Sequence, residues 1–191
     1  LTSSPACLGT GMRASVMLHL PGLALRGEVG QVEQALTRLG ATLRGAFGDG
    51  SEAWGDLYQL GNAVSLGENE EATVGRVDEL AREVIRHEQS ARLGLARRET
   101  IRLYDHIGRS YGILRFSRLL TTEEALGGIS ALVTGVRLGI LPTVNLDALN
   151  RLLLDVQPGH LRCRAPAETE RAEHDVVRAD RVREALSEAP R

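Results

Sequence analysis

The sequence contains no lysine, and all 23 of its strongly basic side chains are arginines. A phosphate site that depends on a P-loop lysine is therefore excluded, so any phosphate contact must come from arginine or from backbone N–H groups. Aromatic residues make up only 3% of the chain, which leaves little surface on which nucleic-acid bases could stack. The formal net charge of −2 offers no basic field to nucleic acid either, and we expect no nucleic-acid partner.

Only two cysteines occur, Cys7 and Cys163, and they lie far apart in the sequence. This spacing matches neither a disulfide framework nor a zinc site, so we predict no metal centre and a reducing, cytoplasmic location. No run of about 18 apolar residues is present, and no secretory signal is visible. We therefore expect neither a membrane span nor a membrane partner.

Residues 8–21, LGTGMRASVMLHLP, join a turn with two glycines to a strand of strict alternation. The apolar face of this strand holds Ala14, Val16, Leu18 and Leu20. The other face holds Arg13, Ser15, Met17 and His19. Such a half-buried strand is typical of an antiparallel sheet with one open face. On that face Arg13 is either a solvated edge residue or a group held in place to bind a phosphate.

Two further strands are predicted at residues 41–47 and 54–64, with the glycine-rich loop GAFGDGS (45–51) between them. Three glycines in this loop allow a close backbone approach to a ligand, but a wide β-hairpin would also use them. Arg44 enters the loop, whereas Asp49 and Glu52 leave it. Positively and negatively charged side chains therefore lie close together in the sequence of this loop.

Helical patterns fill the remaining chain. A short helix is predicted at residues 30–40, and Asn69 is placed to cap a long one that runs to about Arg98. The predicted apolar stripe of the long helix is Val74, Val77, Leu80, Ala81, Val84, Ile85, Ala91 and Leu95. Residues 100–117 form the next predicted helix, whose apolar positions are Ile101, Tyr104, Ile107 and either Tyr111 or Gly112.

A capping box at residues 121–124 opens a further helix that Pro142 ends. Its predicted buried positions are Leu126, Ile129, Leu132 and Val133. Asn145 is placed to cap a helix that stops near Pro158, and a charged helix at residues 168–186 ends the chain. The sequence thus predicts an α+β fold, in which residues 1–98 hold an antiparallel sheet flanked by helices and residues 99–191 form a small all-helical domain.

Three stretches together resemble the guanidino (phosphagen) kinase family. They are GTGMRASVM (9–17), RGAFGD (44–49) and GDLYQLGN (55–62), in the family's order and spacing. The RASVM motif (13–17) and the predicted helical tail resemble the bacterial protein-arginine kinase branch of this family. The resemblance implies the C-terminal part of a catalytic domain at residues 1–98 and a regulatory, phosphoarginine-binding domain at residues 99–191.

The resemblance also implies an activity and its partners. It implies transfer of the ATP γ-phosphoryl group, with Mg²⁺, to arginine side chains of proteins. The implied partners are a Clp-type chaperone and protease system of protein quality control, an activator protein and further copies of the chain in a homo-oligomer.

In the family, the arginines that match Arg13 and Arg44 bind the nucleotide phosphates. This role fits the chemistry, because phosphoryl transfer depends on positioning and on neutralising charge. The residues implied to line the same nucleotide site are Ala14, Ser15, Val16 and Met17, together with Gly45, Ala46, Phe47, Gly48 and Asp49. Asp49 is also implied to approach the substrate guanidinium, although it is one methylene shorter than the usual glutamate.

The tail holds HDVVRA at residues 174–179, which resembles the RDxxRA segment that binds phosphoarginine in protein-arginine kinases. His174, Asp175 and Arg178 share one helix face. Arg178 suits the phosphoryl group and Asp175 the guanidine N–H groups, while His174 stands where the family has arginine. The alternative is an ordinary surface pair of Asp175 and Arg178.

Two departures from the family qualify the expected activity. Ser4 stands where the family has a reactive cysteine, and Cys7 stands where it has asparagine. The family's upstream phosphate-binding arginines and acidic base are not in this chain, so we expect an N-terminally truncated piece that is inactive alone. The alternatives are a non-catalytic phosphoarginine-binding or adaptor module and, less favoured by the helical tail, a small-molecule guanidino kinase.

Overall fold

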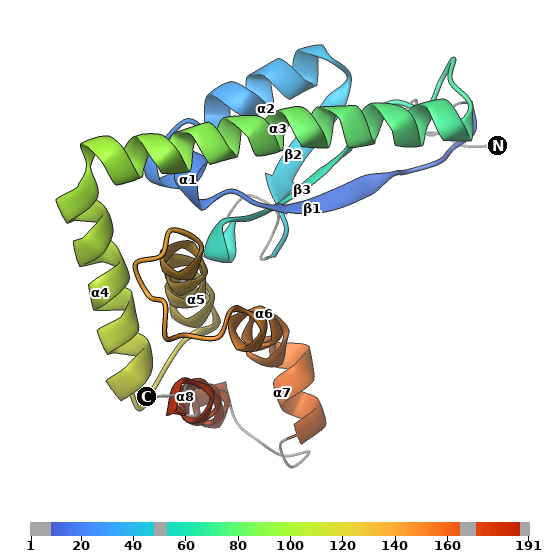
Figure 1. Ribbon diagram of the computed structural model, residues 1–191. Coiled ribbons are helices and arrows are strands. Elements are labelled where there is room, and N and C mark those ends of the chain that lie inside the picture. Colours follow the sequence, from blue (N-terminus) through green and yellow to red (C-terminus); the bar gives the residue numbers. More distant parts are fainter. Residues whose placement is uncertain (1–8, 48–52, 165–170, 188–191) are drawn as a thin grey trace. The chain divides into compact units, whose positions relative to one another are not determined.

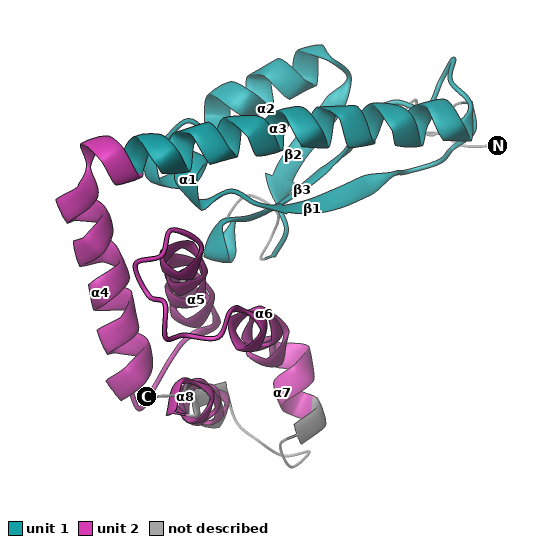
Figure 2. Ribbon diagram, in the orientation of Figure 1, with its two compact units in different colours: residues 1–95 teal, residues 96–191 magenta. Residues whose placement is uncertain are grey.

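The computed structural model describes residues 9–47, 53–164 and 171–187. The chain divides into two compact units, Leu1–Leu95 and Ala96–Arg191 (Figure 2). The first unit contains an antiparallel sheet with helices, and the described part of the second unit is helical. The predicted α+β fold is therefore confirmed. No described helix combines the length and the apolar character needed to cross a bilayer.

Within the described residues of the first unit, the sheet has three strands: β1 (Ser15–His19), β2 (Ala41–Gly45) and β3 (Leu57–Asn62). The strand order is β1-β3-β2, and both pairings are antiparallel (Figure 1). The last strand in the sequence is thus the central strand in space. It carries hydrogen bonds to β1 on one side and to β2 on the other.

Helices cover one face of this sheet: α1 (Pro21–Leu25), α2 (Val29–Arg38) and α3 (Glu70–Arg98). The buried core between them consists of Leu18, Leu20, Leu23, Leu36, Ala41, Leu43, Leu60, Ala81, Val84 and Ala91. Val16 packs against this core, whereas Ser15 and Met17 are exposed on the opposite face. The predicted alternation of the first strand is confirmed, and within the described residues of the first unit no helix covers the face that carries Ser15 and Met17.

The long helix α3 begins where its cap predicts. The side chain of Asn69 accepts a hydrogen bond from the backbone N–H of Ala72, 2.8 Å away. Val77, Ala81, Val84, Ala91 and Leu95 are buried as predicted, but Val74 and Ile85 are exposed. Their places on the buried side are taken by Thr73 and Glu88, because contact with the sheet decides burial and hydrophobic periodicity alone does not.

Glu88 is a fully buried carboxylate of α3 that caps a second helix. Its two oxygens accept the backbone N–H groups of Gly22 (2.8 Å) and Leu23 (2.9 Å) at the start of α1. The guanidinium of Arg92 lies 2.7 Å from the same carboxylate. Burial raises the pKa of Glu88, although these contacts oppose the shift.

The second unit contains α4 (Thr100–Phe116), α5 (Thr122–Arg137), α6 (Leu146–Asp155), α7 (Pro158–Arg164) and α8 (Arg171–Ser187). The predicted capping box is present: Thr121 and Glu124 bond to each other's backbone N–H groups. Asn145 caps α6 as predicted. All four predicted core positions of α5 are buried, so α5 is the central helix of this unit.

Other local features differ from the predictions or were missed by them. Residues Trp54–Asp56 form a tight turn before β3, because the left-handed backbone of Gly55 (φ 69°) and Asp56 (φ 55°) is incompatible with an extended strand. The short helix α1 was not predicted. Helix α6 ends at Asp155, near Pro158 as predicted, but the helix α7 that Pro158 begins was not predicted, although proline suits the first turn of a helix. On α4, Ile101 and Tyr104 are exposed, while Leu103 and Leu114 are buried with Ile107.

Candidate functional site

A pocket of about 130 Å³ opens on the face of the sheet opposite α1, α2 and α3. Its lining residues are Arg13, Ala14, Ser15, Thr42, Arg44, Gln59, Gly61 and Asn62. They come from all three strands and from the segment that precedes β1. The pocket therefore brings together the two arginines that sequence reasoning singled out, although 31 positions separate them in the chain.

Strand register explains why the two arginines share this pocket. Gly61 in the central strand pairs with Ser15 of β1 on one side and with Thr42 of β2 on the other. Gln59 likewise pairs with both Met17 and Arg44. Because side chains alternate along a strand, Arg44 projects from the same open face as Ser15 and Gln59.

Gly61 leaves the centre of the pocket open. A Cβ atom at this position would lie 3.0 Å from the carbonyl oxygen of Ala14 and 3.3 Å from the Cβ of Ser15. Next to Gly61, Gln59 Nε2 donates a hydrogen bond of 2.8 Å to Ser15 Oγ, diagonally across β3 and β1. Gly61 therefore contributes only backbone to the pocket, while Arg13, Arg44, Gln59 and Thr42 contribute polar side chains.

Asn62 fixes the segment that carries Arg13. Its Oδ1 accepts the backbone N–H of Ala14 (2.8 Å), and its Nδ2 donates to the carbonyl of Met12 (3.0 Å) and to that of Val64 (3.1 Å). The Arg13 guanidinium in turn donates from Nη1 to the main-chain carbonyl of Asn62, 3.0 Å away. Only 2% of Asn62 is exposed. The side chain thus extends the β1–β3 contact beyond the last regular strand pair.

The two-glycine turn before Arg13 is confirmed. Gly9 (φ 86°) and Gly11 (φ 66°) both adopt the left-handed backbone that glycine tolerates. At Gly9 any side chain would also collide with the chain, because a Cβ would lie 2.3 Å from the carbonyl oxygen of Ser65. The turn is therefore held against residues 65–66.

The electrostatics of the pocket favour an anion. Within the described residues, neither Arg13 nor Arg44 forms an ion pair with a carboxylate, and no acidic side chain lines the pocket. Two guanidinium groups without paired acids match the geometry and charge of phosphate oxygens. In the same part of the chain, no cluster of three His, Cys, Asp or Glu side chains is placed to hold a metal ion.

Not every predicted nucleotide-site residue lines the pocket. Val16 faces the core, and Met17 is exposed on the open face beside it. Gly45 is the last residue of β2, and Ala46 and Phe47 follow it; all three are half-buried, and the N–H of Ala46 bonds to the carbonyl of Leu57. Gly48, Asp49, Ser4 and Cys7 lie outside the described residues.

Sequence reasoning assigned no role to Thr42, Gln59, Gly61 or Asn62. Gln59, Gly61 and Asn62 lie within the GDLYQLGN stretch, where the glycine inside a strand was the available signal. Glycine within a strand often marks a place where a ligand approaches.

In the second unit, Arg178 is buried, with 2% of its surface exposed. Its guanidinium donates to the carbonyls of Val156 (3.0 Å) and Leu120 (2.6 Å) and to the carboxylate of Asp175. Asp175 and Arg178 therefore meet across one helical turn, while His174 is half-buried nearby. The Arg178 side chain ties α8 to the segments that follow α4 and α6.

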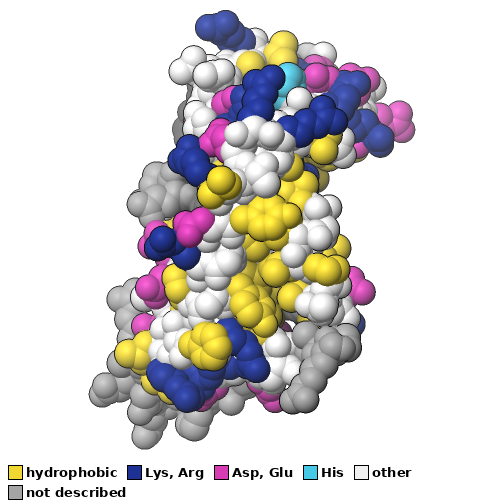
Figure 3. Space-filling view, turned by 60° about the vertical axis from the view of Figure 1, so that its left-hand side comes forward, with side chains coloured by type: hydrophobic (Ala, Val, Ile, Leu, Met, Phe, Trp, Pro, Cys, Tyr) yellow, Lys and Arg dark blue, Asp and Glu magenta, His cyan; other side chains and the backbone are white. Residues whose placement is uncertain are grey.

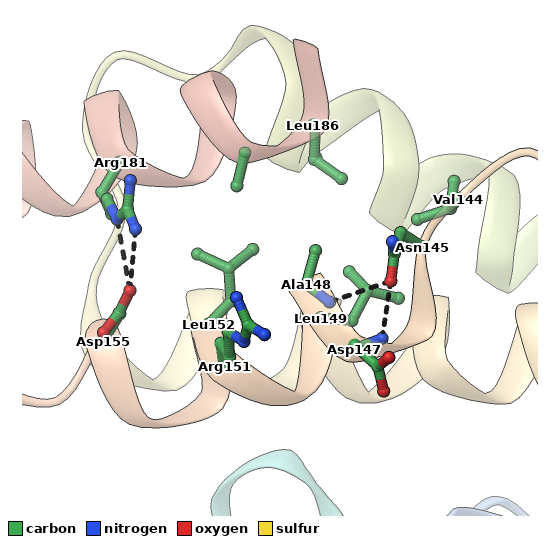
Figure 4. A pocket seen from close by; sticks show the side chains of 11 residues that line it. Val144, Asn145, Asp147, Ala148, Leu149, Arg151, Leu152, Asp155, Arg181 and Leu186 are labelled. Carbon is green, nitrogen blue, oxygen red and sulfur yellow. Dashed lines mark hydrogen bonds and ion pairs between the residues drawn. The ribbon is translucent and has the colours of Figure 1, made fainter. Parts of the chain in front are cut away.

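A larger pocket of about 340 Å³ lies between α6 and α8 (Figure 4). Leu149, Leu152 and Leu186 contribute its apolar wall. At one end Arg181 and Asp155 point toward each other and form an ion pair of 3.0 Å. At the other end Asn145 is occupied in capping α6. His174, Asp175 and Arg178 are not among its lining residues.

Two family comparisons cover nearly the whole chain. Residues 1–91 match the family model "ATP:guanido phosphotransferase, C-terminal catalytic domain", and residues 100–191 match "Protein-arginine kinase McsB C-terminal domain". The chain belongs to the ATP:guanido phosphotransferase family, in its protein-arginine kinase branch. The pocket with Arg13 and Arg44 lies within the first matched region, and the HDVVRA segment lies within the second.

Curated relatives support this membership. The chain is 41% identical over 186 residues to the protein-arginine kinase of Syntrophomonas wolfei. This alignment covers 97% of this chain and 52% of that protein. The chain is 40% identical over 187 residues to the protein-arginine kinase of Symbiobacterium thermophilum, and this alignment covers 98% of this chain and 53% of that protein. The protein-arginine kinase of Brevibacillus brevis is 41% identical over 186 residues. The chain spans about half the length of these relatives.

Proposed function

We propose that this chain is the C-terminal part of a protein-arginine kinase and that its open sheet face binds the phosphates of ATP. The observation that carries this proposal is the shared pocket of Arg13 and Arg44. Relatives named protein-arginine kinase support the substrate class, which is arginine side chains of proteins. ATP supplies the phosphoryl group that the reaction transfers.

Each arginine has a separate part in the proposed site. Arg13 is held by Asn62 at a fixed place beside the Gly61 hollow, so it acts as a preset donor to phosphate oxygens. Arg44 extends from the opposite strand and neutralises charge from the other side. Two guanidinium groups arranged in this way stabilise charge that spreads over phosphoryl oxygens during transfer.

The pocket fits a phosphate better than a bare metal ion, because its polar groups are guanidinium, amide and hydroxyl. Mg²⁺ would therefore be held by the nucleotide and by groups outside this pocket. Asp49 retains its proposed part beside the substrate guanidinium. For the complete protein we also propose a cytoplasmic location and work with a Clp-type proteolytic system, an activator protein and further copies of the chain.

The second candidate function concerns α8. The Asp175–Arg178 pair favours a phosphoarginine site there, but Arg178 already bonds to Val156 and Leu120. We propose that His174 and Asp175 meet the ligand and that Arg178 holds their helix in place. Titration with phosphoarginine tests this role, since Asp175→Asn should abolish binding without unfolding the chain. Binding that survives this substitution would contradict it.

Calorimetric titration of the chain with Mg·ADP and with pyrophosphate tests the sheet-face site. Arg13→Ala and Arg44→Ala should each weaken binding about tenfold to a hundredfold, because each removes a charge-assisted hydrogen bond. Arg38→Ala is the matched control, since Arg38 is exposed at the end of α2 and away from the pocket. A folded chain that binds neither ligand, or an equal loss in Arg38→Ala, would contradict the proposal.

The chain alone should show no kinase turnover, since the family's upstream phosphate-binding segments are not within it. Incubation with ATP and an arginine-containing protein, followed by detection of phosphoarginine, checks this expectation. Measurable phosphorylation by the chain alone would contradict this expectation, since it would show that catalysis does not need the upstream segments.

A further inference from the structure

Methionine is rare in this chain, and both of its methionines flank Arg13. Met12 directly precedes Arg13, and Met17 follows it by four positions in β1. Met17 is 56% exposed, whereas Met12 is half-buried. The thioether sulfur of methionine is the atom that oxidants convert to a sulfoxide, and an exposed sulfur meets a dissolved oxidant more readily. Met17 is therefore the methionine that is more open to oxidation.

An exposed large apolar side chain is unusual in the strands of this protein. Most such side chains belong to helices or connecting segments, and Figure 3 shows hydrophobic side chains gathered over α4, where Ile101 and Phe116 are exposed. Among the residues of the described strands β1, β2 and β3, only Met17 is large, apolar and exposed. It lies on the sheet face that carries the pocket of Arg13 and Arg44.

Strand register places Met17 in one row with Arg44. Gln59 of β3 pairs with Met17 on one side and with Arg44 on the other. All three side chains are exposed, and their row runs beside the row that contains Gly61. Neighbouring strands lie about 4.8 Å apart, so Met17 is one strand away from Gln59 and two strands away from Arg44. A chemical change at Met17 therefore reaches the pocket through Gln59.

The side-chain amide of Gln59 bonds to the pocket and not to Met17. Its Nε2 donates to Ser15 Oγ over 2.8 Å. A thioether sulfur is a weak acceptor, so Met17 does not compete for this donor. A sulfoxide oxygen carries partial negative charge and accepts hydrogen bonds well, and at Met17 it stands on the strand directly opposite Gln59. Oxidation of Met17 therefore draws the Gln59 amide away from Ser15.

We propose that Met17 is an oxidation site that controls the affinity of the sheet-face pocket for phosphate groups. This inference rests on the proposed phosphate-binding function of that pocket. In the reaction, a lone pair of the Met17 sulfur attacks one oxygen of hydrogen peroxide, and the O–O bond breaks. The departing hydroxide takes the proton of the transferred oxygen and becomes water. The sulfur is thereby oxidised by two electrons to the sulfoxide, and the peroxide is reduced by two.

Two effects of the sulfoxide weaken the pocket. Ser15 loses the donor that holds its hydroxyl, so this part of the pocket is no longer fixed before the anion arrives. The sulfoxide oxygen also adds partial negative charge to the face on which Arg13 and Arg44 attract anions. We expect the dissociation constant for pyrophosphate to rise about threefold to tenfold, the effect of disturbing one neutral hydrogen bond.

Calorimetric titration of the 191-residue chain with pyrophosphate, before and after treatment with hydrogen peroxide, measures this rise. Mass spectrometry of peptides should find the sulfoxide at Met17 before it appears at Met12. Methionine sulfoxide reductase should return the affinity to its starting value, because it restores the thioether. Circular dichroism confirms that the treated chain remains folded.

Met17→Leu is the decisive variant, because leucine has a similar volume and no sulfur. Peroxide should leave the pyrophosphate affinity of this variant at its own untreated value. Met12→Leu is the matched control, and treatment should weaken its binding as much as it weakens binding by the wild type. Met17→Gln places a polar acceptor opposite Gln59, so without any peroxide it should bind pyrophosphate more weakly than Met17→Leu does.

Failure of the proposed function and failure of this inference give different results. A folded, untreated chain that does not bind pyrophosphate would contradict both the phosphate site and its control by Met17. Binding that is present before treatment and unchanged once Met17 is oxidised would overturn the inference alone. An equal loss of affinity in treated Met17→Leu, or oxidation of Met12 ahead of Met17, would also overturn it.

Discussion

The guanidinium of Arg13 donates to the main-chain carbonyl of Asn62, 49 residues further along the chain. The side chain of Asn62 returns the contact by binding the backbone on both sides of Arg13. The placement of this arginine therefore depends on a residue of the neighbouring strand. A cation that is held in advance loses less entropy when an anion arrives.

Asn62→Ala should lower the free energy of unfolding by about 2–4 kcal/mol. It removes three hydrogen bonds and leaves partly buried backbone groups without these partners. Urea unfolding followed by circular dichroism measures the change. Gln59→Ala is the control, because its single side-chain bond is exposed and should contribute under about 1 kcal/mol. A similar decrease in unfolding free energy in both variants would show that the Asn62 side chain stabilises the sheet no more than an exposed hydrogen bond does.

Gly61→Val should weaken pyrophosphate binding more than it weakens folding. The new side chain occupies the centre of the pocket, and its Cβ would press on the carbonyl of Ala14. Valine otherwise suits a strand, so a large loss of stability is not expected. Calorimetry and thermal unfolding separate the two effects. Gly75→Ala on α3, where a Cβ meets open space, should stabilise the chain by up to about 1 kcal/mol and leave binding unchanged.

Arg178→Ala should destabilise the chain by about 3–5 kcal/mol. The substitution leaves the carbonyls of Val156 and Leu120 without their donor in a buried place. Arg181→Ala is the comparison, since that side chain is one third exposed and its ion pairs lie nearer to solvent. Denaturant unfolding should give a much lower free energy of unfolding for Arg178→Ala than for Arg181→Ala. Equal stability of the two variants would contradict a structural role for Arg178.

The stability of the chain should carry a pH dependence that comes from Glu88. Burial raises the pKa of Glu88 above its ordinary value of 4.5, so the folded chain holds this proton more tightly than the unfolded chain. Its contribution is fully present below pH 4.5 and is lost as the pH rises through the folded pKa. The unfolding free energy of the wild type relative to Glu88→Gln should therefore increase as the pH falls from 8 to 4.5.

Glu79→Gln removes an exposed carboxylate from the same helix and serves as the control for lost charge. The prediction would be contradicted if the difference in unfolding free energy between the wild type and Glu88→Gln stayed constant from pH 8 to 4.5, or if it decreased toward low pH. Either result would show that Glu88 does not cause the pH dependence of stability.

Local signals were enough for the capped helices. Asn69 and the Thr121–Glu124 box fix where α3 and α5 begin, because caps are short-range hydrogen bonds. The turn at Gly55 and Asp56 was missed, because its backbone conformation interrupts an apolar pattern that otherwise suits a strand. Ile101 and Tyr104 were misplaced, because periodicity finds an apolar face without showing what covers it.

The candidate site was only partly accessible to sequence reasoning. Family resemblance supplied Arg13 and Arg44, whereas Gly61 and Asn62 act through strand register, which joins residues 46 to 50 positions apart. No local pattern encodes such a pairing. The burial of Arg178 was likewise set by Leu120 and Val156, which lie far from it in the sequence.

The strand order β1-β3-β2 has a consequence for how the chain is made. During synthesis β1 and β2 emerge first, and neither has its hydrogen-bonding partner until residues 57–62 follow. Ordering of the pocket must therefore wait for β3, a strand that carries neither arginine. A pause or a premature stop before residue 57 would leave both arginines on the nascent chain with no surface to hold them together.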